Sequence, residues 1–97
     1  MRNKENVIKW ARDKGILDKS TPLKQHVKTV EEINEILEAI LNNNKEDLAD
    51  AIGDSLVTLI IQAELNGLDV EDCLEKAYKV ISKRTGKMIN GIFVKDN

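Results

Sequence analysis

Acidic side chains recur at helical spacing in two neighbouring stretches of the chain. The segment KTVEEINEILEAI contains Glu31, Glu32, Glu35 and Glu38, and the next apolar stretch contains Asp47, Asp50 and Asp54. A helix turns about 100° per residue, so each set would share one side of its helix. Crowded carboxylates repel one another and lose hydration unless a hard cation neutralises them. Mg²⁺ prefers oxygen ligands and bridges carboxylates to phosphates, so the pattern favours a magnesium site for a phosphorylated substrate.

The competing interpretation is that both acidic stripes are solvated outer faces, which is the usual role of charge runs on amphipathic helices. The second stripe, however, continues into Val57, Ile61 and Leu65, while the opposite side carries a predicted core of Leu48, Ile52, Leu56, Leu59 and Ala63. A helix that is apolar all round must be covered on both sides. We therefore expect Asp50 and Asp54 at the edge of a buried groove.

Helix start and stop signals place these stripes on two consecutive helices. Thr21 followed by Pro22 predicts a helix from Pro22 to about Leu41, and Asn44 predicts a cap for a helix reaching about Asn66. The short Asn42–Asn44 connection predicts an antiparallel helical hairpin. The acidic stripes should therefore face each other.

Two further helices are expected outside this hairpin. One covers residues 4–14 and ends at Gly15; the other starts at Val70, after the cap residue Asp69, reaches about Thr85 and is closed by Gly86. The tail KMINGIFVKDN has a turn signal at Asn90 and Gly91, which predicts a short hairpin or an extended arm. The fold class is thus all-α, an antiparallel helical bundle in a single domain of 97 residues.

Composition excludes several classes of protein. The formal net charge of −2 provides no overall field to attract a nucleic acid polymer or an anionic membrane. The most apolar run, SLVTLIIQAEL, is shorter than the roughly 20 residues of a membrane span. A lone Cys73 forms no internal disulfide, and the first residues lack the apolar core of a secretion signal, so a cytoplasmic location is expected.

These motifs resemble the all-α nucleoside triphosphate pyrophosphohydrolases of the MazG-like family. EEINE matches the family's first acidic motif, and DAIGD matches the second with one change, because Ala51 occupies the position where the family usually has glutamate. Asp50 or Asp47 could take its place. The stretch from Gln25 onward, including KRTGK and NGIFVK, is similar to small phage or Firmicute-type members.

The resemblance implies cleavage of a nucleoside triphosphate between the α and β phosphates. Mg²⁺, or Mn²⁺ in its place, would be held by Glu32, Glu35, Asp50 and Asp54, and Glu31 or Glu35 would orient or deprotonate the attacking water. The resemblance also implies a homodimer or homotetramer, in which subunits complete the four-helix packing.

Cationic and amide side chains could contact the nucleotide. A solvated surface role explains the lysines and Arg84 equally well, a solvated side chain is the expectation for Gln25, and a turn role explains Asn90 without function. The candidates are Gln25, Lys28, Lys83, Arg84, Lys87 and Asn90. Trp10 could stack on a base, but a role in the core or in a contact between subunits is favoured, since the chain has few aromatic residues. Because of Ala51, a non-catalytic helical interaction module with a degraded metal site remains the alternative function.

Overall fold

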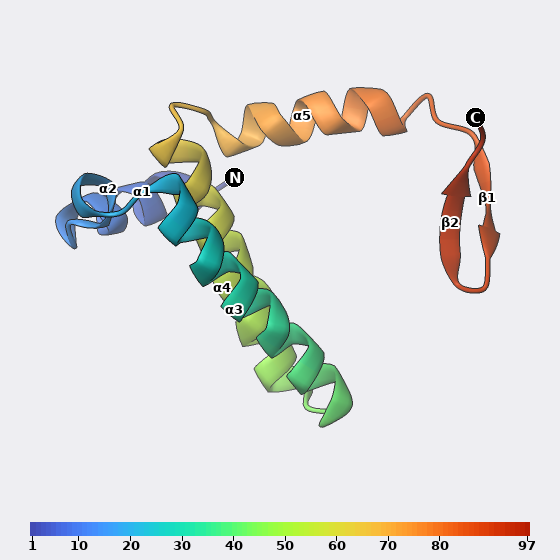
Figure 1. The fold of residues 1–97 in the computed structure, drawn as a ribbon, viewed down its shortest axis with the longest axis horizontal. Helices are drawn as coiled ribbons and strands as arrows, with labels where there is room; N and C mark the ends of the chain where they lie inside the picture. Colours follow the sequence, from blue (N-terminus) through green and yellow to red (C-terminus); the bar gives the residue numbers. More distant parts are fainter.

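The structure, a computed structural model, describes residues 1–97 and is mostly helical, as predicted. Five helices precede one two-stranded antiparallel sheet (Figure 1). In chain order the elements are α1 (Lys4–Asp13), α2 (Ile16–Lys19), α3 (Pro22–Leu41), α4 (Lys45–Leu65), α5 (Val70–Ile81), β1 (Gly86–Ile89) and β2 (Ile92–Lys95). Only the short helix α2 was not expected from the sequence. No helix combines the length and apolar character needed to cross a membrane.

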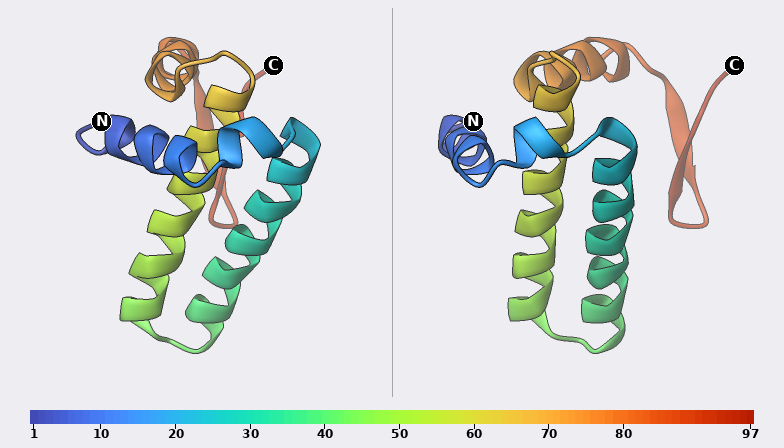
Figure 2. Two further views of the ribbon diagram at one scale, coloured as in Figure 1. Left: turned by 90° about the vertical axis from the view of Figure 1, so that its left-hand side faces the viewer. Right: turned by 60° about the vertical axis from the view of Figure 1, so that its left-hand side comes forward.

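The helices α3 and α4 form the predicted antiparallel hairpin (Figure 2). Their starts follow the local signals, because the Thr21 side chain accepts a hydrogen bond from the backbone N–H of Lys24 at 3.2 Å. The Asn44 side chain likewise accepts from the backbone N–H of Asp47 at 3.0 Å. The hairpin is therefore defined by its caps and by the tight connection between them, in which Asn43 adopts a positive φ of 52°.

The side of α4 that is buried differs from the prediction. Ile52, Leu56 and Leu59 are 46%, 48% and 43% exposed, so the prediction that they are core residues is wrong, whereas Ala63 of the same predicted side is buried. The buried side chains of this helix are instead mostly small, namely Ala51, Ser55, Thr58, Ile60, Ile61 and Ala63. The hydroxyl groups of Ser55 and Thr58 donate to backbone carbonyls of their own helix, which satisfies them without a partner from α3. Small side chains let the two helices approach closely and leave the larger ones outside.

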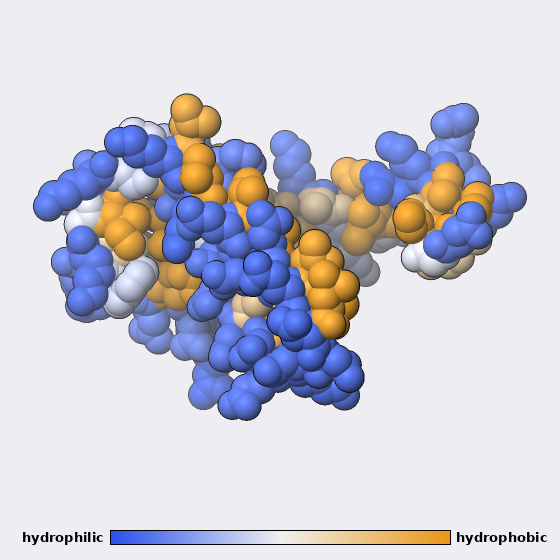
Figure 3. All heavy atoms as spheres, turned by 60° about the horizontal axis from the view of Figure 1, so that its bottom comes forward, coloured by the Kyte–Doolittle hydropathy of each residue, from blue (hydrophilic) through white to orange (hydrophobic).

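A single chain consequently buries little hydrophobic surface. Only 11 of the 97 residues are buried, and none of the large side chains is fully enclosed. Hydrophobic side chains are visible on the surface of the helical part and of the β-hairpin in Figure 3. Contiguous apolar surface of this kind marks contact sites, so α3 and α4 carry a face that a further helix could cover.

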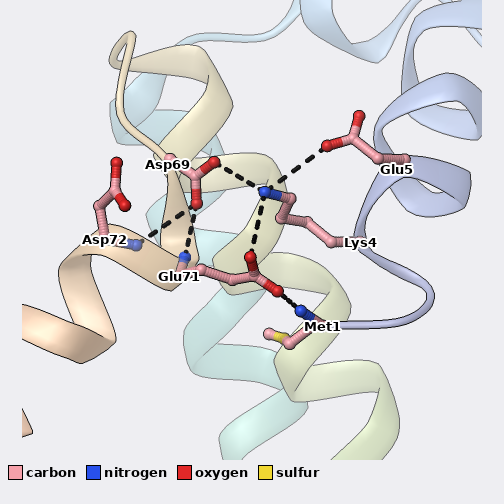
Figure 4. A network of polar contacts seen from close by, with 6 residues as sticks. All are labelled: Met1, Lys4, Glu5, Asp69, Glu71 and Asp72. Carbon is pink, nitrogen blue, oxygen red and sulfur yellow. Dashed lines mark hydrogen bonds and ion pairs between the residues drawn. The ribbon is translucent and has the colours of Figure 1, made fainter.

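An ion-pair network fixes the junction between α1 and α5 (Figure 4). The Lys4 ammonium group lies 2.7 Å from the Asp69 carboxylate and 3.5 Å from that of Glu71, and the Met1 amino group also pairs with Glu71. Asp69 also accepts the backbone N–H groups of Glu71 and Asp72, which confirms it as the cap of α5. The hydrogen bond from Lys4 lowers the pKa of Asp69, and the same contact raises the pKa of Lys4.

The helix α5 ends at Ile81, so the prediction that it reaches Thr85 and is closed by Gly86 is wrong. Gly86 instead opens β1 opposite Lys95, where an added Cβ would lie 2.4 Å from the carbonyl oxygen of Val94. The strand pairing therefore requires glycine at this position. The tail forms the hairpin that was one of its two predicted forms, with positive φ at both turn residues, Asn90 and Gly91.

Candidate metal site

Three acidic side chains converge where α3 and α4 face each other. One carboxylate oxygen from each of Glu32, Glu35 and Asp54 lies within 4.8 Å of the others. Glu32 and Glu35 stand one turn apart on α3, and the antiparallel pairing brings Asp54 of α4 beside them. The group thus joins both of the acidic motifs that were recognised in the sequence.

Glu32 is the unusual member of this cluster because it is buried. Glu32 is 8% exposed, and its Oε2 atom is shielded from solvent and has no hydrogen-bond partner. Its Oε1 atom lies 3.2 Å from the Lys28 ammonium group. An unpartnered buried carboxylate oxygen is costly in a native protein, and a cation bound beside it would remove that cost. The donor set, which is entirely oxygen, fits a hard divalent ion.

Like-charge crowding perturbs the neighbouring glutamate. The pKa of Glu35 is raised above its ordinary value, first by hydrogen bonding of its protonated form to Glu32, then by repulsion from the Glu32 charge. Loss of hydration and the charges of Glu38 and Asp54 add to the shift in the same direction. The pKa of Lys28 is also raised, because its hydrogen bond to Glu32 favours the charged ammonium group. The cluster therefore holds more negative charge than Lys28 offsets.

An open acidic hollow adjoins the cluster. It has a volume of about 230 Å³ and is lined by Glu35, Glu38, Ala39, Asn42, Asp47, Asp50, Ala51 and Asp54. Asp50 and Asp54 are exposed, so in one chain they do not lie at the edge of a buried groove as expected. Ala51 is buried against α3. Asp47 and Asp50 both border the hollow but remain outside the three-residue cluster.

Two other candidates on α3 are not brought into the cluster. The Glu31 side chain is 61% exposed and contacts Lys28 at 3.5 Å. Gln25 is 5% exposed, and its amide nitrogen donates to the carbonyl oxygen of Thr58 at 3.1 Å. The expectation of a solvated glutamine is therefore wrong. Gln25 links α3 to α4, a role that its sequence context did not indicate.

The remaining basic candidates lie far along the chain from the cluster. Lys83 and Arg84 follow α5, Lys87 is in β1 and Asn90 is in the hairpin turn. Neither strand packs against any helix of the same chain. Figure 1 shows this hairpin apart from the α3 and α4 pair. One chain alone therefore does not bring these residues to the acidic cluster.

A second, larger groove borders the site on the other side of Asp54. It has a volume of about 740 Å³, and its wall includes Trp10, Asn3 and Asn6 together with Gly53 and Asp54. Trp10 is about half exposed, so it is not a core residue of the single chain. Asn3 and Asn6 carry no spacing signal that would have singled them out in the sequence.

Comparison with known proteins agrees with this geometry. Residues 20–89 match the MazG nucleotide pyrophosphohydrolase domain. Over 65 residues the chain is 35% identical to an uncharacterized 18.2 kDa protein in the rep-hol intergenic region of Haemophilus phage HP1 (strain HP1c1). That similarity covers 67% of this chain and 40% of the phage protein. No solved structure matches the chain.

The domain match includes all of α3, α4 and α5 and therefore all three members of the acidic cluster. The chain belongs to the MazG nucleotide pyrophosphohydrolase family, as its acidic motifs indicated. The activity that this family's description gives is that of a nucleotide pyrophosphohydrolase.

Proposed function

We propose that this chain hydrolyses nucleoside triphosphates between the α and β phosphates, releasing a nucleoside monophosphate and pyrophosphate. The observation that carries the proposal is the unpartnered Oε2 atom of Glu32, which is buried beside carboxylate oxygens of Glu35 and Asp54. When all three acids are ionised, a packing role would leave that oxygen without compensation. A site for a divalent cation and its phosphate ligand accounts for it.

The residues that would hold Mg²⁺, or Mn²⁺, are Glu32, Glu35 and Asp54. Asp50, which borders the hollow, would supply the carboxylate that the family usually has at the position of Ala51. When bound, the cation would neutralise phosphate charge and stabilise the charge that develops in the transition state. The Lys28 ammonium group, 3.2 Å from Glu32, would hold one carboxylate in place and lie close to the incoming phosphates.

Proton transfer is assigned to Glu35. The water oxygen bonds to one phosphorus flanking the α–β bridge, the bond from that phosphorus to the bridging oxygen breaks, and a carboxylate accepts the proton released by the water. Glu35 lies inside the cluster, whereas Glu31 faces Lys28 at the outer surface. Position therefore favours Glu35 over Glu31 as the general base.

The groove beside Asp54 is proposed to receive the nucleoside part of the substrate. Its volume of about 740 Å³ lies in the range of small-molecule sites, its wall contains one aromatic ring, and it shares Asp54 with the acidic cluster. A nucleotide bound there would place its base near Trp10 and its phosphates near the carboxylates.

The functional unit is proposed to be a homodimer or homotetramer. The exposed side chains of Ile52, Leu56 and Leu59 form an apolar face on α4 that a second copy could cover. Sedimentation analysis should then give two or four times the chain mass of 10.9 kDa. A species of single-chain mass at micromolar concentration would contradict this assignment.

Release of pyrophosphate from a panel of ribonucleoside and deoxyribonucleoside triphosphates with Mg²⁺ tests the activity. Glu35→Gln should lower kcat by about 100-fold or more, because the neutral amide cannot accept a proton. Glu64→Gln, on the same helical hairpin and outside the site, serves as the control. Retained activity in Glu31→Gln would support the choice of Glu35. No release from any nucleotide would favour the non-catalytic interaction module.

A further inference from the structure

The C-terminal arm, defined as residues 82–97, has no packing partner within its own chain. The strands β1 and β2 contact each other and no helix. The hairpin nevertheless carries five exposed apolar side chains, those of Met88, Ile89, Ile92, Phe93 and Val94. An isolated two-stranded hairpin is at best marginally stable in water. The arm therefore needs a surface to pack against.

The charge of the arm is opposite to that of the acidic hollow. Lys83, Arg84 and Lys95 gather around a recess of about 620 Å³ at the base of the arm, where Thr85 donates to the Asp96 carboxylate at 2.9 Å. Lys87 adds a further cation on β1. The hollow between α3 and α4 is lined by five carboxylates and has no basic residue on its wall. The two surfaces are electrostatically complementary.

The arm cannot reach the hollow of its own chain in this structure. Asp54 lies 11 residues before the end of α4, a distance of about 16 Å along the helix, and the chain leaves from that far end. The helix α5, whose 12 residues span about 18 Å, runs across the end of α4 and carries the arm to one side of the α3 and α4 pair (Figure 1). The contacts of Lys4 with Asp69 and Glu71 hold this direction (Figure 4).

We propose that the arm docks across the acidic hollow of a second copy of this chain and completes its site. This inference rests on the proposed function for its catalytic meaning, since Lys83, Arg84 and Lys87 would meet substrate phosphates held by the neighbour's carboxylates. The apolar side chains of the hairpin would at the same time cover exposed apolar surface of the neighbouring helices. Each site would thus combine acids from one chain with cations from another.

Chemical cross-linking tests the docking without any assay of activity. Cys73 is exposed, so Cys73→Ser provides a background free of cysteine. One chain then carries Asp50→Cys and a second, of different length through a tag, carries Lys87→Cys. A short bismaleimide should join the two chains to each other, and a control chain with Lys76→Cys on α5 should not be joined. Absence of this mixed product overturns the proposal. A third variant carries both cysteines on one chain, and a cross-link that forms only within that chain also overturns the proposal.

Mixing of complementary variants tests the shared site. One chain carries Glu35→Gln with an intact arm, and the other carries Lys83→Ala and Arg84→Ala with intact acids. Each alone should be inactive, but a randomly mixed dimer should recover about a quarter of the wild-type activity, because half of the dimers are mixed and each contains one complete site. No recovery of activity in the mixture refutes the docking. If the wild type itself is inactive, the proposed function fails and the cross-linking result alone decides the docking.

Discussion

Replacing Gln25 by leucine should destabilise the protein by removing a buried bond between the two main helices. The amide nitrogen of Gln25 donates to the carbonyl oxygen of Thr58 at 3.1 Å, and the residue is 5% exposed. Leucine keeps the approximate size of the side chain but cannot donate. Gln62 offers a matched comparison, since its amide nitrogen donates to the carbonyl oxygen of Pro22 at 3.0 Å across the same helix pair but at an exposed position.

The expected magnitudes follow from burial. Loss of the bond at Gln25 should cost about 1–2 kcal/mol, because water cannot replace the donor in the buried interface. The same change at Gln62 should cost under about 0.5 kcal/mol, since water takes over the bond. For a domain of this size, the first value corresponds to a fall in melting temperature of at least about 4 °C.

Urea unfolding at one fixed protein concentration, followed by circular dichroism, measures both free energies of unfolding. The concentration must be fixed because the stability of an oligomer depends on it. Steady-state kinetics of the same variants provide the second measurement, and KM should be unchanged by Gln25→Leu in the folded protein. An unchanged stability together with a raised KM would refute the reasoning and return Gln25 to the substrate-binding role that its sequence position predicted.

Three further outcomes are expected. Adding Mg²⁺ should raise the melting temperature of the wild type, and Glu32→Gln should abolish this rise because the variant lacks the buried carboxylate at the site. An equal rise in melting temperature in both proteins would mean that the ion binds elsewhere. Nucleotide binding should change the fluorescence of Trp10, the only tryptophan, and unchanged fluorescence at saturation would exclude the groove as the nucleoside site. Asn6→Ala, in the same groove, should raise KM by a larger factor than it lowers kcat. The Lys4 contact lowers the pKa of Asp69 in the folded protein below its ordinary 3.8, so the stability that this contact contributes is present above pH 3.8 and is lost as the pH falls through the lower folded value. Asp69→Asn keeps a capping side chain but loses the charge, so its melting temperature should lie below that of the wild type at neutral pH and approach it in acid. A difference in melting temperature that does not change with pH would contradict the ion pair.

Local signals in the sequence were sufficient for the starts of α3, α4 and α5 and for the acidic motifs. Thr21, Asn44 and Asp69 cap the helices that follow them, because a cap depends on a side chain and backbone groups only two or three residues away. The turn at Asn90 and Gly91 forms for the same reason, since these residues tolerate positive φ. The spacing of Glu32 and Glu35 likewise follows from helical geometry alone.

Long-range contacts decided what these local signals left open. The helix α5 was predicted to reach about Thr85, but residues 82–85 form the connection to β1, in which Gly86 pairs with Lys95. The pattern of apolar residues favoured the side of α4 with Ile52 and Leu56 as the core, yet close approach of two helices selected the small residues on another side.

The sequence by itself therefore determined the mostly helical character, the family and the acidic residues available for a metal site, because each depends on local spacing or on matching motifs. Only the tertiary structure decided which acids meet, that Glu32 is buried with an unpartnered oxygen, and that Gln25 joins the helices. Helical periodicity assigns residues to faces, but the rotation of one helix against another depends on how all the side chains between them pack.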